Sequence, residues 1–355
     1  MAFDTASDLM LAAALWTACG ALVATLALLV AIAIMRVRLL RRLERGRRVA
    51  ALWNPLLAQC AGGVPDPLPR LQRRDAESFL LLWCHAQESL RGDAQAHLRE
   101  LARRLGVPAW TGQLLRSRRV DRRLLALVTL GHLRTRDHAA WLHTLISSAP
   151  PVVSITAARA LMRIDANICV PPLLAATARR DDWPLAAVGS ILRECDPQVV
   201  GPMLAAAIRS ALGKDDAEGV ARLLRLHVAA HAETLREAVL EVIATAAAPE
   251  ALAAALQALW HPQDVGHARR LLGHPEWFVR VAAARAIGRF GDQDDVARLA
   301  AALADPSWWV RYRAAQALCS LPGMGPAELG VLNLRLTDRF AADMLRQAIA
   351  ERTPA

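Results

Sequence analysis

Few side chains in this sequence have the types and spacing that catalysis or metal binding requires. His227 and His231 lie four residues apart, so a helix would place both on one face, where they could hold a metal ion. No third ligand accompanies them at metalloprotease spacing, and we interpret them as surface or packing histidines. Two aspartate pairs, 181–182 and 215–216, flank predicted helix breaks, where an aspartate caps the helix that follows. A catalytic carboxylate pair would also need an apolar cleft that raises one pKa.

The common catalytic signatures are absent as well. The sequence has no glycine-rich phosphate loop after a strand, no G-x-S-x-G elbow and no kinase signature set. Its six cysteines include no C-x-x-C pair, so we interpret them as small buried side chains in a reducing compartment. We therefore expect no catalytic residue, no metal site and no cofactor, and we do not expect an enzyme.

The elements that carry these residues are predicted to be helices. Alanine and leucine dominate a composition that is 54% hydrophobic and only 5% aromatic, which favours helices over strands. The segment His274-Pro275-Glu276-Trp277-Phe278-Val279-Arg280 continues to Ile287, and it recurs 31 residues later as residues 305–318. A fixed period in this range indicates stacked units, none of which buries its apolar face alone.

These two copies resemble the HEAT repeat, in the short form also called the PBS-lyase-type HEAT-like repeat of bacterial proteins. The matching core is Asp/His-Pro-x-x-x-Val-Arg-x-x-Ala-Ala-x-Ala-Leu/Ile, at 274–287 and 305–318. The resemblance implies an all-α fold, an α-solenoid of helical hairpins whose second helices line a concave side. It places HEAT-like repeats over 120–337, with a helical amino-terminal part of the solenoid at 75–119 and a capping helix and tail at 338–355.

The repeats bring two sets of candidate binding residues together. Tryptophans fall in or near the turns between paired helices, where they either pack under the turn or form a protein-binding edge; they are Trp183, Trp277, Trp308 and Trp309. Arginines of the second helices are candidates for the concave face: Arg159, Arg163, Arg280, Arg285, Arg289, Arg311 and Arg313. Some of these must be solvated or paired with acids, so only a subset is available to a partner.

An apolar segment near the amino terminus predicts a membrane anchor. Residues 9–35 are 27 consecutive uncharged residues, enough for a helix of roughly 40 Å across a hydrocarbon core of about 30 Å. A signal peptide would have a shorter core and a basic amino-terminal flank, and a buried helix would have a polar face. We therefore expect residues 1–8 outside the membrane and a transmembrane helix at 9–35. A basic juxtamembrane segment and Pro/Gly-rich linker follow at 36–74.

The distribution of charge supports this topology. The basic flank consists of Arg36, Arg38, Arg41, Arg42, Arg45, Arg47 and Arg48. Such residues stay on the cytoplasmic side and contact anionic lipid, which places the solenoid in the cytoplasm of a bacterial inner-membrane protein. With Glu44 this flank contributes +6, and residues 116–123 contribute +4, which together equal the net charge of +10. The rest of the chain is neutral, so we do not expect nucleic-acid binding.

We therefore expect a membrane-anchored HEAT-repeat scaffold for protein–protein interaction. Its expected partners are membrane-associated proteins, with an envelope polysaccharide-synthesis or secretion complex as the client class. Two alternatives remain open. One is an enzyme of the bilin-lyase type, which the family resemblance allows, and the other is a sensor that binds an anionic ligand through the arginines of 116–123.

Overall fold

The fold is helical throughout the part of the chain that the structure describes. The computed structural model describes residues 2–148, 150–229 and 232–352. These residues contain no strand, and 80% of the structure is helix. The all-α prediction is confirmed. The chain divides into two compact units, Met1–Leu133 and Arg134–Ala355.

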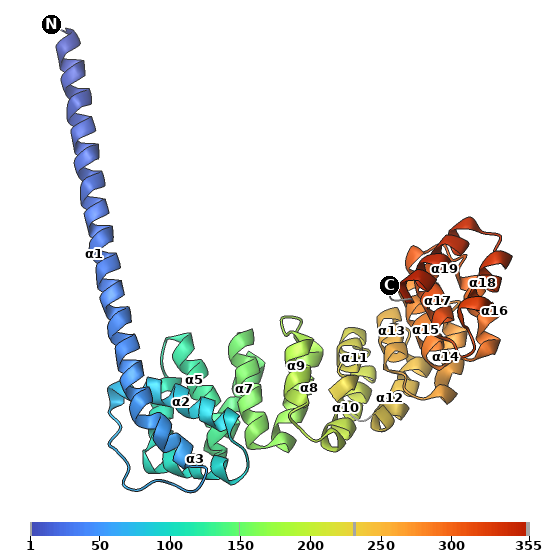
Figure 1. The fold of residues 1–355 in the computed structure, drawn as a ribbon, viewed down its shortest axis with the longest axis horizontal. Helices are drawn as coiled ribbons and strands as arrows, with labels where there is room; N and C mark the ends of the chain where they lie inside the picture. Colours follow the sequence, from blue (N-terminus) through green and yellow to red (C-terminus); the bar gives the residue numbers. More distant parts are fainter. Residues whose placement is uncertain (1, 149, 230–231, 353–355) are drawn as a thin grey trace. The chain divides into compact units, whose positions relative to one another are not determined.

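The first unit is organised around one long helix. Its elements are α1 (Ala2–Gln59), the 3-10 turn η1 (Arg73–Asp75), α2 (Ala76–Ser89), α3 (Asp93–Arg104), α4 (Val107–Leu115) and α5 (Val120–Leu133). Figure 1 shows α1 extending well beyond α2 and α3, which lie beside its carboxyl end. The unit also includes α5, which the sequence analysis had assigned to the repeats of 120–337.

The carboxyl end of α1 corrects the expected linker over 36–74. The helix continues through the basic flank to Gln59, so only residues 60–72 connect it to η1. It continues because its last turns are part of the core, where Val49, Trp53 and Leu57 are buried. The Trp53 ring meets Phe79 of α2 edge-on, with 4.6 Å between ring centroids. The apolar segment is thus joined to the folded unit by a helix rather than by a flexible linker.

The second unit is an array of helical hairpins. Its described helices form seven pairs: α6 (Ala139–Ser148) with α7 (Pro151–Ile164), α8 (Ala166–Arg179) with α9 (Leu185–Leu192), α10 (Pro197–Leu212) with α11 (Ala217–Leu224), α12 (Ala232–Thr245) with α13 (Pro249–Ala258), α14 (Val265–Leu271) with α15 (Trp277–Phe290), α16 (Val296–Ala302) with α17 (Trp308–Ser320), and α18 (Pro326–Arg335) with α19 (Arg339–Arg352). Short 3-10 turns precede several of them, namely η2 (Arg136–His138), η3 (His227–Ala229), η4 (Pro262–Asp264) and η5 (Gln293–Asp295).

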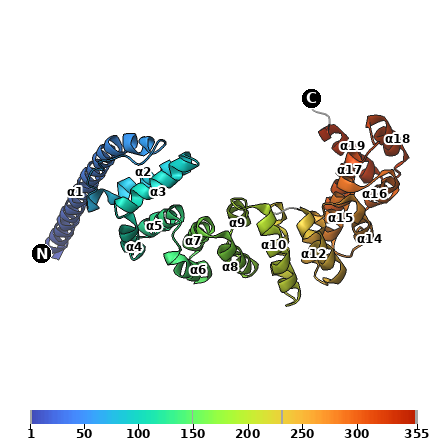
Figure 2. The same ribbon diagram turned by 90° about the horizontal axis from the view of Figure 1, so that it is seen from below.

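The period of the array persists where its sequence signature has decayed. The second helices begin at residues 151, 185, 217, 249, 277, 308 and 339, which are 28 to 34 residues apart. From α11 to α19, each second helix packs against the next one. Figure 2 shows the first and second helices as two rows, most clearly from α6 to α9. The solenoid therefore continues upstream of the two copies that are recognisable by sequence.

Small side chains set the distance between neighbouring second helices. Ala283 of α15 and Ala314 of α17 are completely buried. Gly288 lies so close to α17 that a Cβ atom there would be 2.7 Å from the Cα and Cβ atoms of Ala317. Even one added methyl group would force these helices apart. The alanine-rich second helices thus reflect close helix packing.

Arginine–aspartate pairs join successive hairpins, and we call them inter-repeat brackets. Arg236 of α12 contacts Asp264 at the start of α14, with N···O distances of 2.9 and 2.8 Å. Arg269 of α14 contacts Asp295 before α16 through two contacts of 2.8 Å. Arg280 of α15 contacts Asp305 before α17 at 2.7 and 2.8 Å. Each bracket is bidentate, so it fixes the orientation of the two hairpins as well as their separation.

The brackets lower the pKa values of their carboxyl groups. Burial of Asp305 disfavours its charged form, but hydrogen bonds from Arg280 and the Ser307 N–H outweigh burial and hold its pKa below the ordinary value. Asp295 behaves in the same way beside Arg269. For Asp264, the hydrogen bond from Arg236 is the largest contribution to a lowered pKa. Folding therefore favours the ionised form of all three groups.

Removing one bracket should destabilise the array. Asp305→Ala leaves the guanidinium of Arg280 unpaired, with only 13% of that side chain exposed, and we expect a loss of about 3 kcal/mol in unfolding free energy at neutral pH. Because folding lowers the pKa of Asp305, the bracket contributes fully above about pH 4 and is lost as the pH falls through the folded pKa. Urea denaturation followed by circular dichroism at several pH values measures both effects.

Asp294→Ala, which removes an exposed carboxylate from the preceding turn, is the matched control. It should change the unfolding free energy by less than about 0.5 kcal/mol. Equal losses for the two variants, or a loss for Asp305→Ala that does not diminish in acid, would contradict the structural role of the bracket.

Candidate functional site

Three of the predicted tryptophans form an exposed group, which we call the tryptophan edge. Trp277 opens α15, and Trp308 and Trp309 open α17, 31 residues further on. Their side chains remain 44%, 44% and 56% exposed. Trp308 stacks on Tyr312 at 5.2 Å between centroids and meets Trp309 edge-on at 4.9 Å. Half-exposed rings that pack against one another present apolar area and lose little conformational entropy when a partner binds. Such a surface suits a contact with protein.

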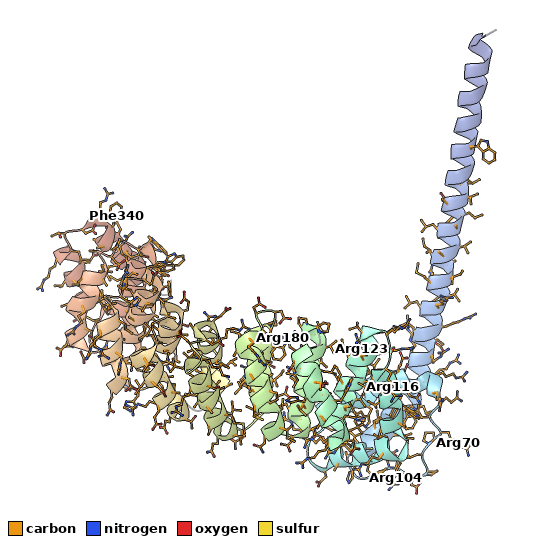
Figure 3. The ribbon with its side chains drawn as sticks, turned by 180° about the vertical axis from the view of Figure 1, so that it is seen from behind. Arg70, Arg104, Arg116, Arg123, Arg180 and Phe340 are labelled. Atoms are coloured by element: carbon orange, nitrogen blue, oxygen red, sulfur yellow. The ribbon has the colours of Figure 1, made fainter. Side chains whose placement is uncertain are left out.

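Trp183 does not belong to this edge, which corrects the sequence prediction. Only 2% of its side chain is exposed, and its Nε1–H donates to Ser154 Oγ of α7 at 3.0 Å. The guanidinium of Arg180, labelled in Figure 3, lies 5.1 Å from the centroid of its ring. Arg222 of α11 donates to its backbone carbonyl at 3.3 Å. The ring fills the space under a turn whose Val-Arg signature is missing, so its role is structural.

Four of the seven predicted concave-face arginines make contacts within the repeat unit. Arg159 and Arg163 of α7 approach Glu194 at 3.2 and 3.5 Å. Arg280 forms a bracket and also donates to the carbonyls of the turn before α15. Arg311 donates to the matching carbonyls before α17, at 2.8 and 3.3 Å. The arginine at the Val-Arg position of the repeat thus supports its own turn.

The other three arginines, Arg285, Arg289 and Arg313, line one groove. The groove has a volume of about 830 Å³ and is bordered by residues of α13, α15, α17 and α19. Buried alanines and Gly288 contribute to its lining, and Arg352 of α19 lies at its border. No aspartate or glutamate among the described residues lies within ion-pair distance of Arg285 or Arg289. We call this feature the arginine groove.

A second hollow continues the arginine groove and adds aromatic and apolar surface. It has a volume of about 1010 Å³ and shares His227, Val228, Leu259 and Arg289 with the first. Arg289 lies 5.3 Å from the ring centroid of Trp260 and 4.8 Å from that of Phe290. The exposed fractions of Trp260 and Val228 are 53% and 71%. Sequence reasoning missed both residues, because they lie outside the repeat signature and only the His-Pro break after Trp260 marks its position.

His227 lines this continuous groove. Its Nδ1 lies 3.0 Å from the Leu224 carbonyl oxygen. Burial lowers the pKa of His227, and the positive charges of Arg289 and Arg285 lower it further, so the ring is neutral at neutral pH. His231 lies outside the described residues. Within those residues, no cluster of three histidine, cysteine or acidic side chains has metal-binding geometry.

The arginines of 116–123 are partly paired. Arg122 contacts Glu77 of α2 at 2.7 Å, and Arg119 pairs with Asp121. Figure 3 labels Arg116 and Arg123 on the first unit. Pairing reduces the charge that this segment presents to an anionic ligand, which makes the sensor interpretation weaker than the charge count alone indicated.

The described apolar part of α1 is exposed, and in the basic flank Arg45 lies 4.0 Å from Asp75 of the folded unit. Every side chain over 22–41 is exposed. Within the described residues, one helix, Leu22–Gln59 of α1, has the length and apolar composition to cross a membrane. In the flank that follows, the side chains of Arg36, Arg38, Arg41, Arg45, Arg47 and Arg48 are exposed, and that of Arg42 lies outside the described set.

Comparison with known families identifies the repeat. A family model of HEAT repeats matches residues 253–319 and, overlapping them, residues 267–351. These ranges contain most of the arginine groove, the tryptophan edge and two of the three brackets. Residues 253–351 are therefore similar to HEAT repeats, as the Pro-x-x-x-Val-Arg copies within them indicated. No curated protein matches the chain.

Two substitutions distinguish the structural tryptophan from the exposed ones. Trp183→Ala removes a buried ring and its hydrogen bond, and we expect it to lower the unfolding free energy by about 3–5 kcal/mol. Trp309→Ala removes an exposed ring and should cost about 1 kcal/mol or less. Thermal or urea denaturation of the full chain measures both. A large loss for Trp309→Ala would show that the edge is packing rather than a free surface.

Proposed function

We propose that this protein is a membrane-anchored scaffold that binds other proteins through its HEAT-repeat unit. The observation that carries the proposal is the exposed apolar segment of α1, which continues as one helix into a folded unit. An apolar helix of this length is stable when lipid covers it, and α1 has no protein cover in the described structure. The basic flank after it favours a cytoplasmic position for the repeats in a bacterial inner membrane.

The repeat unit supplies the binding surface in this proposal. HEAT repeats commonly mediate protein–protein interaction. The tryptophan edge provides aromatic area of the kind that dominates binding at interfaces. Because the anchor confines the protein to the bilayer, it raises the local concentration of these surfaces for membrane-associated partners. The client class that we propose is a membrane-embedded complex, such as an envelope polysaccharide synthase or a secretion machine.

The role that we propose is not enzymatic. The candidate surfaces contain arginines and tryptophans but no nucleophile that is activated by a base. The thiol of Cys319 borders the arginine groove, and burial raises its pKa, which disfavours the reactive thiolate. The arrangement favours recognition over reaction.

Membrane fractionation and cross-linking test the two parts of this proposal. We expect the full chain in the membrane fraction after an alkaline wash. Leu28→Arg combined with Ile32→Arg should release it, because each charge at the centre of a span costs about 3 kcal/mol. Cross-linking followed by affinity purification should enrich a membrane protein with the unaltered chain, and Trp308→Ala combined with Trp309→Ala should reduce that enrichment.

Leu52→Arg places one arginine on an exposed position of α1 outside the apolar run, so it should leave the chain in the membrane. The proposal of a membrane anchor is wrong if the alkaline wash removes the unaltered chain from the membrane. The proposal of a scaffold is wrong if no membrane protein is enriched with the unaltered chain.

A further inference from the structure

We infer that the arginine groove binds an extended acidic segment of a protein partner. The inference rests on the scaffold function proposed above and names the chemistry of its partner. The groove brings together Arg285 and Arg289 of α15, Arg313 of α17 and Arg352 of α19. Exposed apolar side chains continue it toward α13, namely Val228 and Trp260.

The arginines of the groove differ from those of the brackets in lacking carboxylate partners. Arg236, Arg269 and Arg280 each contact an aspartate of the next hairpin. Arg285 follows Arg280 on the same helix, yet no acidic side chain among the described residues pairs with it or with Arg289. Unpaired guanidinium groups beside one another repel, so an added carboxylate stabilises the site.

The acidic residues near the groove do not neutralise it. Glu351 of α19 lines the groove, where its carboxylate accepts hydrogen bonds from Tyr312 Oη at 2.9 Å and from Gln347 at 3.0 Å. Glu233 lies in the neighbouring hollow. Against these two carboxylates stand four guanidinium groups, so the groove keeps an excess of positive charge. Burial is the main cause of the lowered pKa of His227, and the positive charges of Arg289 and Arg285 lower it further.

Two guanidinium groups are held in place before any partner binds. Arg289 is held against the rings of Trp260 and Phe290. Arg313 donates to Gln316 Oε1 at 2.8 Å, while its buried Nε–H has no hydrogen-bond partner within the described structure. Fixed donors lose little conformational freedom on binding, which favours a specific carboxylate contact over a diffuse attraction.

The apolar share of the groove favours a peptide over a nucleic acid. Alanines line it beside Leu256 and Leu259, and the Trp260 ring is half exposed. A peptide offers apolar side chains to such surfaces between its carboxylates, whereas a sugar–phosphate strand offers a continuous row of charge. Four neighbouring helices border the groove, with about 9 Å between the axes of each pair. The three intervals together equal the length of about eight residues of extended peptide.

Fluorescence anisotropy with the full chain in detergent micelles tests this inference. The probe is a labelled peptide of about eight residues in which glutamates alternate with phenylalanines. We expect saturable binding that a glutamine-for-glutamate peptide does not show. Arg285→Gln combined with Arg289→Gln should weaken binding by about tenfold or more. Arg179→Gln combined with Arg335→Gln removes the same charge from exposed positions of two first helices and should leave binding unchanged.

Three outcomes would overturn the inference. They are equal binding of the neutral peptide, equal binding to the groove variant, and tighter binding of a single-stranded oligonucleotide of the same length. Circular dichroism of each variant confirms that it is folded.

The same groove variant also separates this inference from the scaffold proposal. If it captures a membrane partner as well as the unaltered chain does, the scaffold function stands and the groove inference fails. If the unaltered chain captures no partner, the scaffold proposal fails whatever the peptide assay shows.

Discussion

The repeat unit depends on one constraint, namely that no single hairpin covers its own apolar face. From α11 to α19, each second helix finds that cover on the next one, and Gly288 beside Ala317 shows how closely α15 and α17 approach. Apolar packing of this kind is not directional, so it does not by itself fix how one hairpin is rotated on another. The bidentate brackets from Arg236, Arg269 and Arg280 supply that direction. A repeat array of this type is stable because interfaces between neighbours are added along the chain.

Because some arginines are used in brackets between hairpins, only the others are available for function. An arginine at a bracket position is held by the next hairpin, as Arg280 is held by Asp305. The bracket position after Arg311, 25 residues on, is occupied by Leu336, so Arg311 supports only its own turn. Arg285 and Arg289 follow Arg280 on the same helix but face a groove that contains few acids. Arg285 and Arg289 thus have no ion pair with a neighbouring repeat in the described structure. Together with the exposed helix α1, this suits the scaffold that we propose.

The sequence predicted the repeated parts of the fold well and the exceptions poorly. The copies at 274–287 and 305–318 indicated where α15 and α17 lie. The tryptophans at the starts of these helices are exposed, as a protein-binding edge requires and packing under the turn does not. Trp183 has a similar position in the period but is buried, because Ser154 offers its indole a hydrogen-bond acceptor from another helix. The continuation of α1 to Gln59 was missed for a similar reason. Val49 and Trp53 follow a run of arginines that predicts an exposed segment, and only tertiary packing shows that they are buried. Trp260 lies outside the repeat motif, and only the fold brings it to Arg289.

Site-specific photo-cross-linking in intact membranes most directly tests whether the anchored repeat unit binds protein through its groove. A photoreactive side chain replaces Gln316 in the groove or Leu334 of α18, whose side chain is 87% exposed outside it. Our account predicts a covalent adduct with a membrane-associated protein from position 316 and none from position 334. An adduct from position 334 alone, or none from position 316, would contradict it.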